Sequence, residues 1–374
     1  MVNEQMHFYE SSVITTKDGL QCQVYGNEHP FGRIIVKPKY IPTNKIECSA
    51  LQYRFISGKK MNRLNFWVDK KELKSYLDEF RKCYRNYVYI SPVHMGRRFF
   101  FAVPIDNIER IYFPRRGLAE LMKMPYEGLD NHLKTVHDFF SFLLKSGLRV
   151  KDLGITYSTL IGHYFHASDI NIVVYGKRNF WKLMDYLKDA EHPKLRWKNR
   201  EEWLDFRKKR NRSSIFNKDE FVRLMSRKRS EGYFNGNLFV IFGTEKEEEA
   251  WFRWGDEIYY PRGLVTVEGV VTDNLSSVVR PGCYDIRDSK IISYKPDNNA
   301  DNGSDMDCDS IDVKKVVFYS RDYCMLAYPG EKIRACGILE EVKPKKGKPY
   351  YRVVIGYIDS YITDRREEEY IKLV

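Results

Sequence analysis

The alternation of amphipathic helices with short apolar strands in the middle of the chain constrains its fold most strongly. Apolar side chains recur at helical spacing over residues 129–146, and Gly147 supplies a helix stop. Shorter apolar runs bounded by turn residues follow. This alternation predicts a small sheet covered by helices. The later predicted elements are a strand at Leu153–Thr156, a strand at Ile170–Tyr175, a helix at Asn179–Leu187 and a strand at Leu238–Phe242.

The flanking regions are predicted to be rich in β-strands. Residues 1–117 contain strand-like runs broken by prolines, including Pro38, and one helix at Lys70–Tyr84. Residues 262–374 contain five candidate strands and fit a small β-barrel of the OB type. The predicted fold class is therefore α+β, with a β-rich N-terminal domain (1–117), a central α/β domain (118–261) and an OB-like barrel (262–374). An acidic segment, residues 296–312, is predicted to be a disordered insertion in that barrel.

The net charge of +12 predicts a polyanionic partner or an anionic substrate. A basic surface without a partner is the alternative. Residues 194–229 hold fourteen Lys and Arg against five Asp and Glu, with aromatic residues between them. Such a run alone is more typical of a solvated helical face, but its clusters favour a surface that contacts phosphates. The predicted nucleic-acid-binding residues are Arg207, Lys208, Lys209, Arg210, Arg212, Arg227, Lys228 and Arg229.

Several classes of protein are not expected. No run of about 18 apolar residues suggests a membrane span, and the first residues lack the order of a signal peptide. A cytoplasmic protein without a membrane partner is therefore predicted. The seven cysteines show no CxxC spacing, which argues against a zinc ribbon. The GxxxxGK[ST] pattern of a P-loop is also missing from the sequence.

The stretch from Gly154 to Gly176 carries the residues most suited to chemistry. Ser158 stands where a short strand gives way to a turn or helix, and Asp169 and Asn171 stand at the next strand. Side chains at i and i+2 of a strand share a face and can bind the same metal ions. Nucleotidyl transfer uses such groups, because a loop must bind the triphosphate and carboxylates must hold Mg²⁺.

This stretch resembles the hG[GS]…DhDh signature of the DNA polymerase β-type nucleotidyltransferase superfamily. More narrowly, it is similar to a group of archaeal predicted nucleotidyltransferases with the pattern GSxxxG…SDIDLVVYG, and blocks along most of the chain match that group. The resemblance implies that residues 118–261 form a nucleotidyltransferase-like core. It also implies that Ser158 and Tyr157 lie at the nucleotide and that Asp169 and Asn171 lie at a Mg²⁺ site.

The departures from the pattern predict a core that has lost its chemistry. Tyr157 stands where the pattern has glycine, and Asn171 replaces the second aspartate. The strand expected to supply a third carboxylate, Asn237–Gly243, contains none. The residues after it are interpreted as a solvated acidic run: Glu245, Glu247, Glu248 and Glu249. Asp169 would then be the single metal carboxylate, unless Asp152 or Asp185 and nucleotide phosphates complete the site.

Three functions remain open at this point. The preferred one is RNA or other nucleic-acid binding on a degenerate, inactive nucleotidyltransferase core, a pseudoenzyme, because basic and aromatic residues suit unpaired strands. Tyr350, Tyr351 and the loop Lys343–Lys348 of the predicted barrel could take part in that binding. The second is an active enzyme that uses Mg²⁺ as its cofactor and transfers NMP from an NTP to RNA, a protein or a small molecule. The third is a scaffold in a protein complex.

Overall fold

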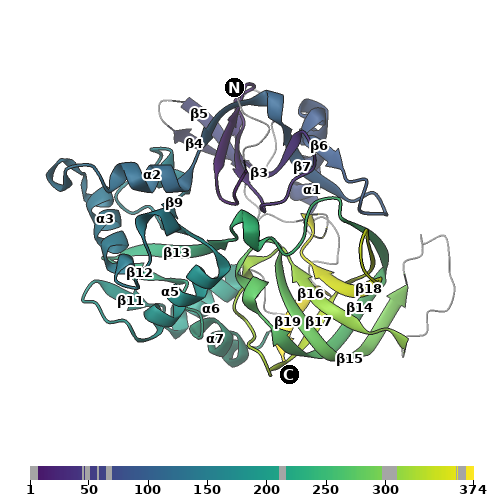
Figure 1. The fold of residues 1–374 in the computed structure, drawn as a ribbon. Coiled ribbons are helices and arrows are strands. Elements are labelled where there is room, and N and C mark those ends of the chain that lie inside the picture. The colour runs from purple at the N-terminus through teal and green to yellow at the C-terminus, as the bar shows by residue number, and fades with distance from the viewer. Residues whose placement is uncertain are drawn as a thin grey trace. The chain divides into compact units, whose positions relative to one another are not determined.

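The computed structural model describes residues 7–43, 46, 51–56, 59–64, 70–209, 216–296, 310–358, 360 and 368–374. The chain forms two compact units (Figure 1). Unit 1 comprises Met1–Asn27, Gly32–Trp67 and Val103–Ala250, and unit 2 comprises Glu28–Phe31, Val68–Ala102 and Trp251–Val374. Helices and several sheets confirm the predicted α+β class. The three predicted domains stay a prediction.

The first sheet of unit 1 has the strand order β4-β5-β3-β2-β1-β8. Apolar residues on its strands, such as Ile14, Val24 and Ile35, are buried. This sheet holds more strands than the sequence predicts, because several of them are short and polar. Its strands are β1 (Val13–Thr16), β2 (Gln21–Val24), β3 (Arg33–Pro42), β4 (Leu51–Ile56), β5 (Lys59–Leu64) and β8 (Ile108–Tyr112).

Strand β3 does not break at Pro38, and that part of the prediction is wrong. Gln21 of β2 pairs with Tyr40, whereas the next residue, Cys22, pairs with Pro38. Lys39 is therefore an extra residue in β3, which makes a β-bulge. A proline, which lacks an N–H donor, is tolerated at such an irregularity. The strand continues, and the bulge changes the direction in which its side chains point.

The second sheet of unit 1 is the predicted α/β sheet, with the strand order β11-β12-β13-β10-β9. Strand β10 pairs parallel with the central strand β13 and antiparallel with the edge strand β9. The strands are β9 (Leu153–Ile155), β10 (Ile170–Tyr175), β11 (Leu195–Trp197), β12 (Glu231–Phe234) and β13 (Asn237–Thr244). The helices are α2 (Pro114–Leu121), α3 (Asn131–Leu144), α4 (Tyr157–Leu160), α5 (Lys177–Asp189), α6 (Arg200–Lys209) and α7 (Lys218–Ser226).

The predicted long helix is α3, which packs its apolar face against this sheet. The side chain of Asp130 caps its first turn by accepting the Leu133 N–H at 2.9 Å. Phe139, on the buried face, lies 4.5 Å from the ring of Phe234 and 4.6 Å from that of Phe239, measured between ring centres. Burial of such aromatic clusters supplies most of the stabilising energy of a small α/β core.

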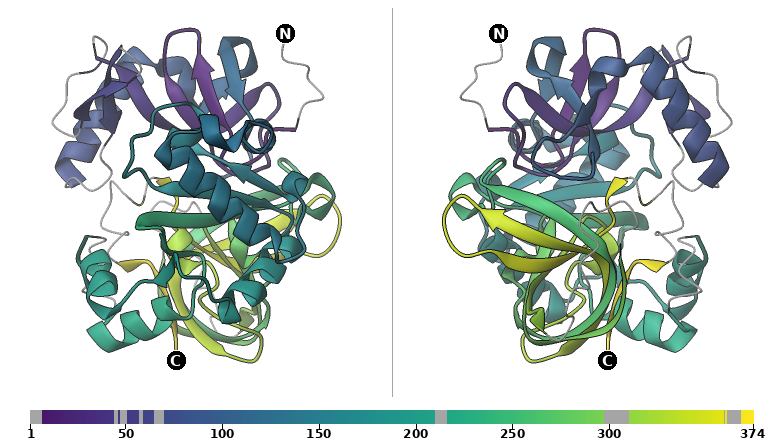
Figure 2. Two further views of the ribbon diagram at one scale, coloured as in Figure 1. Left: turned by 90° about the vertical axis from the view of Figure 1, so that its left-hand side faces the viewer. Right: turned by 90° about the vertical axis from the view of Figure 1, so that its right-hand side faces the viewer.

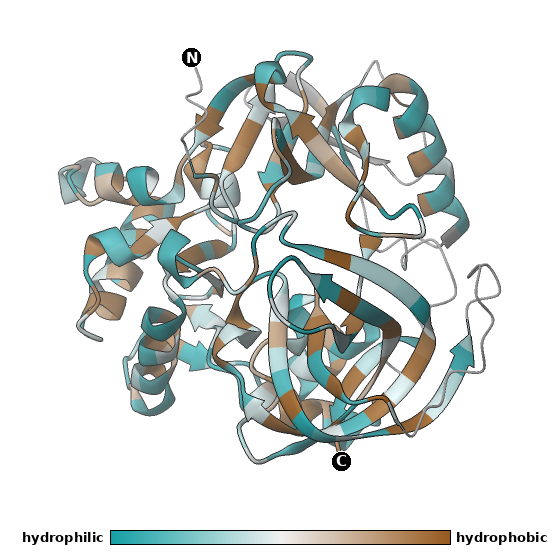
Figure 3. Ribbon diagram, turned by 45° about the vertical axis from the view of Figure 1, so that its right-hand side comes forward, coloured by the Kyte–Doolittle hydropathy of each residue, from teal (hydrophilic) through white to brown (hydrophobic). Residues whose placement is uncertain are grey.

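Unit 2 contains the third sheet, in which the strand order is β14-β15-β16-β18-β17-β19. Strand β14 also pairs with β17, so the pairing of the first five strands closes on itself. The strands curve strongly in both views of Figure 2, and apolar and polar residues alternate along them in Figure 3. The strands are β14 (Glu257–Asp273), β15 (Gly282–Pro296), β16 (Val313–Phe318), β17 (Lys332–Pro344), β18 (Tyr350–Ile355) and β19 (Tyr370–Leu373).

Unit 2 also contains the predicted helix α1 (Lys70–Cys83), strand β6 (Val88–Ile90) and most of strand β7 (Phe99–Pro104), which pairs antiparallel with β6. Residues 297–309, most of the predicted acidic insertion, lie outside the described residues. Within the described part of the chain, no helix has the length and apolar character needed to cross a membrane.

Candidate functional site

A row of side chains crosses one face of the α/β sheet near the start of β10. Asn171 of β10 pairs with Val240 of β13, and Val240 pairs with Glu231 of β12. Residues paired across neighbouring strands point to the same face, and so does Asp169, two residues before Asn171. The row therefore places Asp169, Asn171 and Glu231 on one face, with the apolar side chain of Val240 between the last two.

Glu231 forms an ion pair with Lys198, which directly follows β11. Both side chains are largely buried, with 6% of Lys198 and 15% of Glu231 exposed. The Lys198 ammonium also lies 4.7 Å from the ring centre of Trp203 and 4.9 Å from that of Phe206. A cation placed over aromatic faces is stabilised by their negative electrostatic potential. The charge of Glu231 is thus compensated within the protein.

Asp169 is exposed at the start of β10, but the surrounding protein removes part of the hydration of its carboxyl group. This desolvation raises the pKa of Asp169 above its ordinary value, and the charge of Glu231 acts in the same direction. The positive charges of Arg63, Lys198 and Lys39 act in the opposite direction. The face around Asp169 therefore combines two carboxylates with three basic groups.

Lys39 is directed to this face from the bulge in β3. Its Nζ lies 4.1 Å from the centre of the Tyr157 ring. Burial, together with the nearby charge of Arg63, lowers the pKa of Lys39 to about 7, although Asp169 acts in the opposite direction. Lys39 therefore changes its charge close to neutral pH, unlike an ordinary lysine.

Tyr157, a predicted nucleotide-binding residue, has a left-handed backbone conformation with φ +55°. That region favours glycine and costs a residue with a Cβ about 1–2 kcal/mol. Tyr157 thus has the backbone conformation of a glycine, the residue that the pattern in the sequence analysis places there. The ring makes contacts that a glycine cannot, with the Lys39 ammonium and edge to face with Phe242 at 5.6 Å.

Ser158, the other predicted nucleotide-binding residue, is half-buried and is the second residue of α4. Its carbonyl oxygen accepts the His163 N–H at 2.8 Å, and the Thr156 N–H donates to the Asn171 carbonyl at 3.0 Å. These bonds join both ends of α4 to its neighbours. Because α4 has four residues, its dipole offers little to an anion.

The basic segment, residues 194–229, contains helices α6 and α7, and several of its charges are used inside the protein. Arg207 donates from Nε to the Phe216 carbonyl at 2.9 Å. Arg229 donates to the Ser226 carbonyl at 2.8 Å and lies 4.9 Å from the Trp197 ring centre. These two residues therefore stabilise the segment itself.

The other predicted nucleic-acid-binding residues differ in their exposure. Lys228 is buried and Arg227 is half-buried, whereas Lys208 and Lys209 are exposed at the end of α6. Arg210 and Arg212 lie outside the described residues. Among the described members of this set, Lys208 and Lys209 are the two that present their charge openly to solvent.

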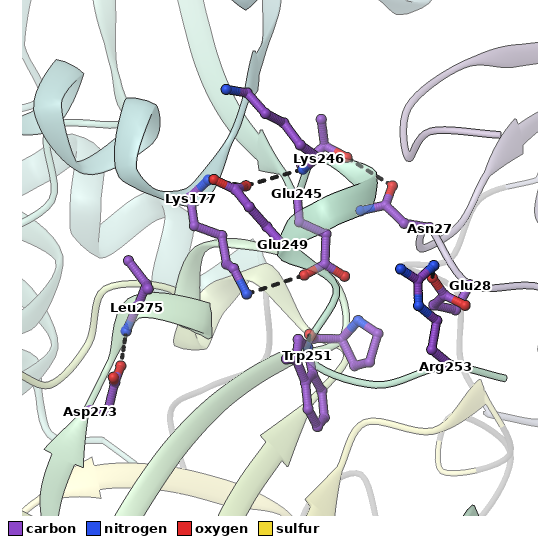
Figure 4. Close-up of polar contacts among 12 residues, drawn as sticks. Asn27, Glu28, Lys177, Glu245, Lys246, Glu249, Trp251, Arg253, Asp273 and Leu275 are labelled. Atoms are coloured by element: carbon purple, nitrogen blue, oxygen red, sulfur yellow. Dashed lines mark hydrogen bonds and ion pairs between the residues drawn. The ribbon is translucent and has the colours of Figure 1, made fainter. Parts of the chain in front are cut away.

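The acidic run after β13 is not uniformly solvated, and for two of its residues the prediction is wrong. Glu247 and Glu248 are exposed, but only 2% of the Glu245 side chain is exposed. Its Oε2 lies 3.4 Å from Lys177 Nζ (Figure 4). The Glu249 carboxylate accepts the backbone N–H of Lys177 at 2.9 Å. Glu245 and Glu249 stabilise the ends of β10 and β13.

The residues on the face around Asp169 do not fit a pair of Mg²⁺ ions. The neighbouring strand β13 carries Val240 opposite Asn171, and Glu231 lies one strand further away and is paired with Lys198. Mg²⁺ requires nearly octahedral oxygen ligands close together. Among the residues that the structure describes, no group of three or more His, Cys, Asp or Glu side chains is placed to hold a metal ion.

Sequence reasoning missed Glu231, Lys198 and Lys39. Glu231 reaches the site through a hairpin, in which β12 and β13 are joined by Asn235 and Gly236 with φ values of +50° and +82°. An Asn-Gly pair between two short runs is a strong hairpin signal, and it would have predicted β12. Lys39 has no comparable signal, because its direction depends on pairing between β2 and β3.

Comparison with known proteins gives one distant relative. No family model matches the chain, and no solved structure matches it. An uncharacterized protein of Methanocaldococcus jannaschii, MJ1086, is 28% identical over 366 residues. The aligned region covers 96% of this chain and 97% of the relative. The chain is thus similar, over nearly its whole length, to an archaeal protein whose description states no activity.

Proposed function

We propose that this protein binds nucleic acid, with RNA as the preferred ligand, and that its nucleotidyltransferase-like core does not transfer nucleotides. The observation that carries the proposal is the face around Asp169. Lys39, Arg63 and Lys198 act on the Asp169 carboxylate together with Glu231, and β13 offers Val240 where a third metal carboxylate would be needed. Such a face favours phosphate groups over a pair of divalent metal ions.

The topology of unit 1 supports the nucleotidyltransferase-like part of this proposal. A strand (β9), a short helix (α4), a second strand (β10), a helix (α5) and a later parallel strand (β13) follow in the order that the sequence pattern requires. Asp169 and Asn171 stand at the start of β10. The left-handed Tyr157 keeps the turn that the pattern assigns to glycine.

The closed strand pairing of unit 2 supports an OB-type barrel. Strands β14 to β18 pair in the order 14-15-16-18-17 and back to 14, with β16 and β18 parallel. OB-type barrels bind single strands through their loops and one face. The loop between β17 and β18 exposes Lys345, Lys346 and Lys348, which could contact phosphates. Tyr350 is less suited to stacking on a base, because its hydroxyl donates to Glu257 Oε1 at 2.9 Å.

The test is binding of a fluorescently labelled single-stranded RNA as a function of salt. We expect the logarithm of the affinity to fall linearly with the logarithm of the salt concentration. Replacing Lys208 and Lys209 by Ala should weaken binding. It should also make the dependence of log affinity on log salt concentration shallower, by the amount that corresponds to the loss of about 2 phosphate contacts at most. Binding that is absent, or that does not respond to salt, contradicts the proposal.

The second candidate function is nucleotidyl transfer, and the position of Glu231 favours it. Glu231 is in the row of Asn171 and could act as a third carboxylate if Lys198 moved away. Incubation with labelled NTPs, Mg²⁺ or Mn²⁺, and RNA or protein acceptors separates the two functions. Label transfer that is lost in Asp169→Ala would establish catalysis and overturn the preferred proposal.

A further inference from the structure

Lys198 lies next to the row of Asp169, Asn171 and Glu231. Glu231 pairs with the Lys198 ammonium, and the charge of that ammonium also acts on Asp169. A divalent ion at this face would need the same two carboxylates. The ammonium therefore stands in electrostatic competition with any metal ion that approaches them.

Lys198 is held in this place by its surroundings. Its side chain is only 6% exposed, and the rings of Trp203 and Phe206 both lie within 5 Å of its charge, at 4.7 and 4.9 Å. An exposed lysine could move into solvent at little cost, whereas a desolvated cation between aromatic rings and a carboxylate cannot. The cation is thus a fixed part of the site.

Charge at the face works against a metal ion in a second way. Lys39 and Arg63 act on Asp169 from β3 and β5. With Lys198 in place, positive groups outnumber the two carboxylates when Lys39 is protonated. A divalent cation entering the face meets net repulsion, while a phosphate group meets net attraction.

We propose that Lys198 is a built-in cation that takes the place of a divalent metal ion at the face that carries Asp169 and Glu231, and that phosphate groups bind at this face without Mg²⁺. The role of the face in phosphate binding rests on the proposed function. The exclusion of metal by Lys198 does not, and it can be measured without any nucleic acid.

The first experiment titrates the full chain with Mn²⁺ alone and follows the signal of free Mn²⁺ by electron paramagnetic resonance. The wild-type protein should show no Mn²⁺ binding that depends on Asp169. Lys198→Met should gain one Mn²⁺ site. Its affinity should exceed that of any residual Mn²⁺ binding by the wild-type protein at least about tenfold. The double variant Lys198→Met/Asp169→Asn should lose it again.

The matched control is Lys208→Met, which removes an exposed charge from the end of α6. It should leave Mn²⁺ binding unchanged, because Lys208 does not belong to the site. If Lys198→Met does not fold, as judged by circular dichroism, Lys198→Gln removes the charge while keeping a hydrogen-bond donor for Glu231. Mn²⁺ binding by the wild-type protein that Asp169→Asn abolishes would overturn the proposal, and so would a folded charge-removing variant that gains no site.

The second experiment measures binding of a labelled single-stranded RNA with EDTA and with Mg²⁺ at equal ionic strength. The wild-type affinity should be no higher with Mg²⁺ than with EDTA, and Lys198→Met should bind more weakly in EDTA. An affinity that rises several-fold with Mg²⁺ contradicts metal-independent binding. If RNA does not bind under either condition, the proposed function fails, whereas the Mn²⁺ titration still decides the role of Lys198.

Discussion

Two lysine–glutamate pairs lie near opposite ends of the same α/β sheet in unit 1. Lys177 and Glu245 follow the carboxyl ends of β10 and β13, with 7% and 2% of their side chains exposed. Lys198 and Glu231 lie near the start of β10, with 6% and 15% exposed. Burial is similar, but the charges of the second pair also act on a further carboxylate, Asp169. We therefore expect the first pair to matter mainly for stability and the second pair to matter mainly for the charge of the face around Asp169.

The largest expected effect concerns the first pair. Lys177→Met leaves the Glu245 carboxylate buried without its cation and should lower the free energy of unfolding by about 3–5 kcal/mol. Urea denaturation followed by circular dichroism measures this change. RNA affinity of the folded variant should stay unchanged.

The double variant Lys177→Met/Glu245→Leu is the control for this prediction. Removing both charges should recover most of the loss, since a buried ion pair contributes little more than apolar residues of similar volume. If Lys177→Met is as stable as the wild-type protein, the Lys177–Glu245 pair does not stabilise the fold. The two ion pairs then do not differ in the role that we assign to them.

The second effect concerns Lys198, where we expect a smaller loss of stability. Glu231 is more exposed than Glu245, and so it can be hydrated when its partner is removed. Methionine also keeps the contact of the side-chain stem with Trp203 and Phe206. Lys198→Met should therefore cost about 1–3 kcal/mol in the same denaturation measurement. If Lys198→Met lowers the free energy of unfolding as much as Lys177→Met does, the two lysine–glutamate pairs contribute equally to stability, and this prediction is wrong.

The third effect tests the backbone at Tyr157. Tyr157→Ala and Tyr157→Gly both remove the ring over Lys39, but glycine tolerates φ +55° and alanine does not. Tyr157→Ala should be less stable than Tyr157→Gly by about 1 kcal/mol. Equal stability of the two variants would mean that position 157 is not left-handed in solution.

The fourth effect is a dependence of RNA affinity on pH. We expect it to arise at the end of the sheet that carries Asp169. The pKa of Lys39 is lowered to about 7, so its positive charge disappears as pH rises through that value. RNA affinity should fall by about threefold over this range, the effect of one phosphate contact. Lys39→Arg, which stays charged, should abolish this step. His163 lies near Lys39, and its pKa is lowered by burial and by the Lys39 charge.

The same lowered pKa affects stability with a defined sign. Above about pH 7 the folded protein has released the Lys39 proton, whereas the unfolded chain holds it up to the ordinary lysine pKa. The unfolded state then binds more protons, so the contribution of Lys39 makes the protein more stable as pH rises through this window. In Lys39→Met this contribution should vanish from the pH profile of urea denaturation.

Much of the fold could be predicted from local sequence patterns. The strand Ile170–Tyr175 matches β10 in both bounds, and α1 and α3 lie at the predicted positions. These elements have strong apolar periodicity and clear stop signals. Strands β11 and β12 were missed because they are short and contain charged residues, Arg196 in β11 and Glu231 in β12. The α+β class follows from the strongly patterned elements alone.

The candidate site was predictable only in part. Asp169, Asn171 and Tyr157 lie in one continuous stretch, so a local pattern identifies them. Glu231 and Lys198 reach the site through the pairing of three strands, which no local pattern contains. Burial of Glu245 was also unpredictable, since an acidic run looks the same whether or not a distant lysine such as Lys177 lies against it.

The turn at Asn235 and Gly236 never touches the site, yet it sets which residue of β12 faces Asp169. Side chains alternate between the faces of a sheet, so a shift of one residue in this hairpin would replace Glu231 by Gly232 on that face. Lys198 would then lose the carboxylate with which it forms its ion pair. The charge of this face thus depends on the length of a two-residue connection, and an insertion there would change that charge without altering any charged residue of the face.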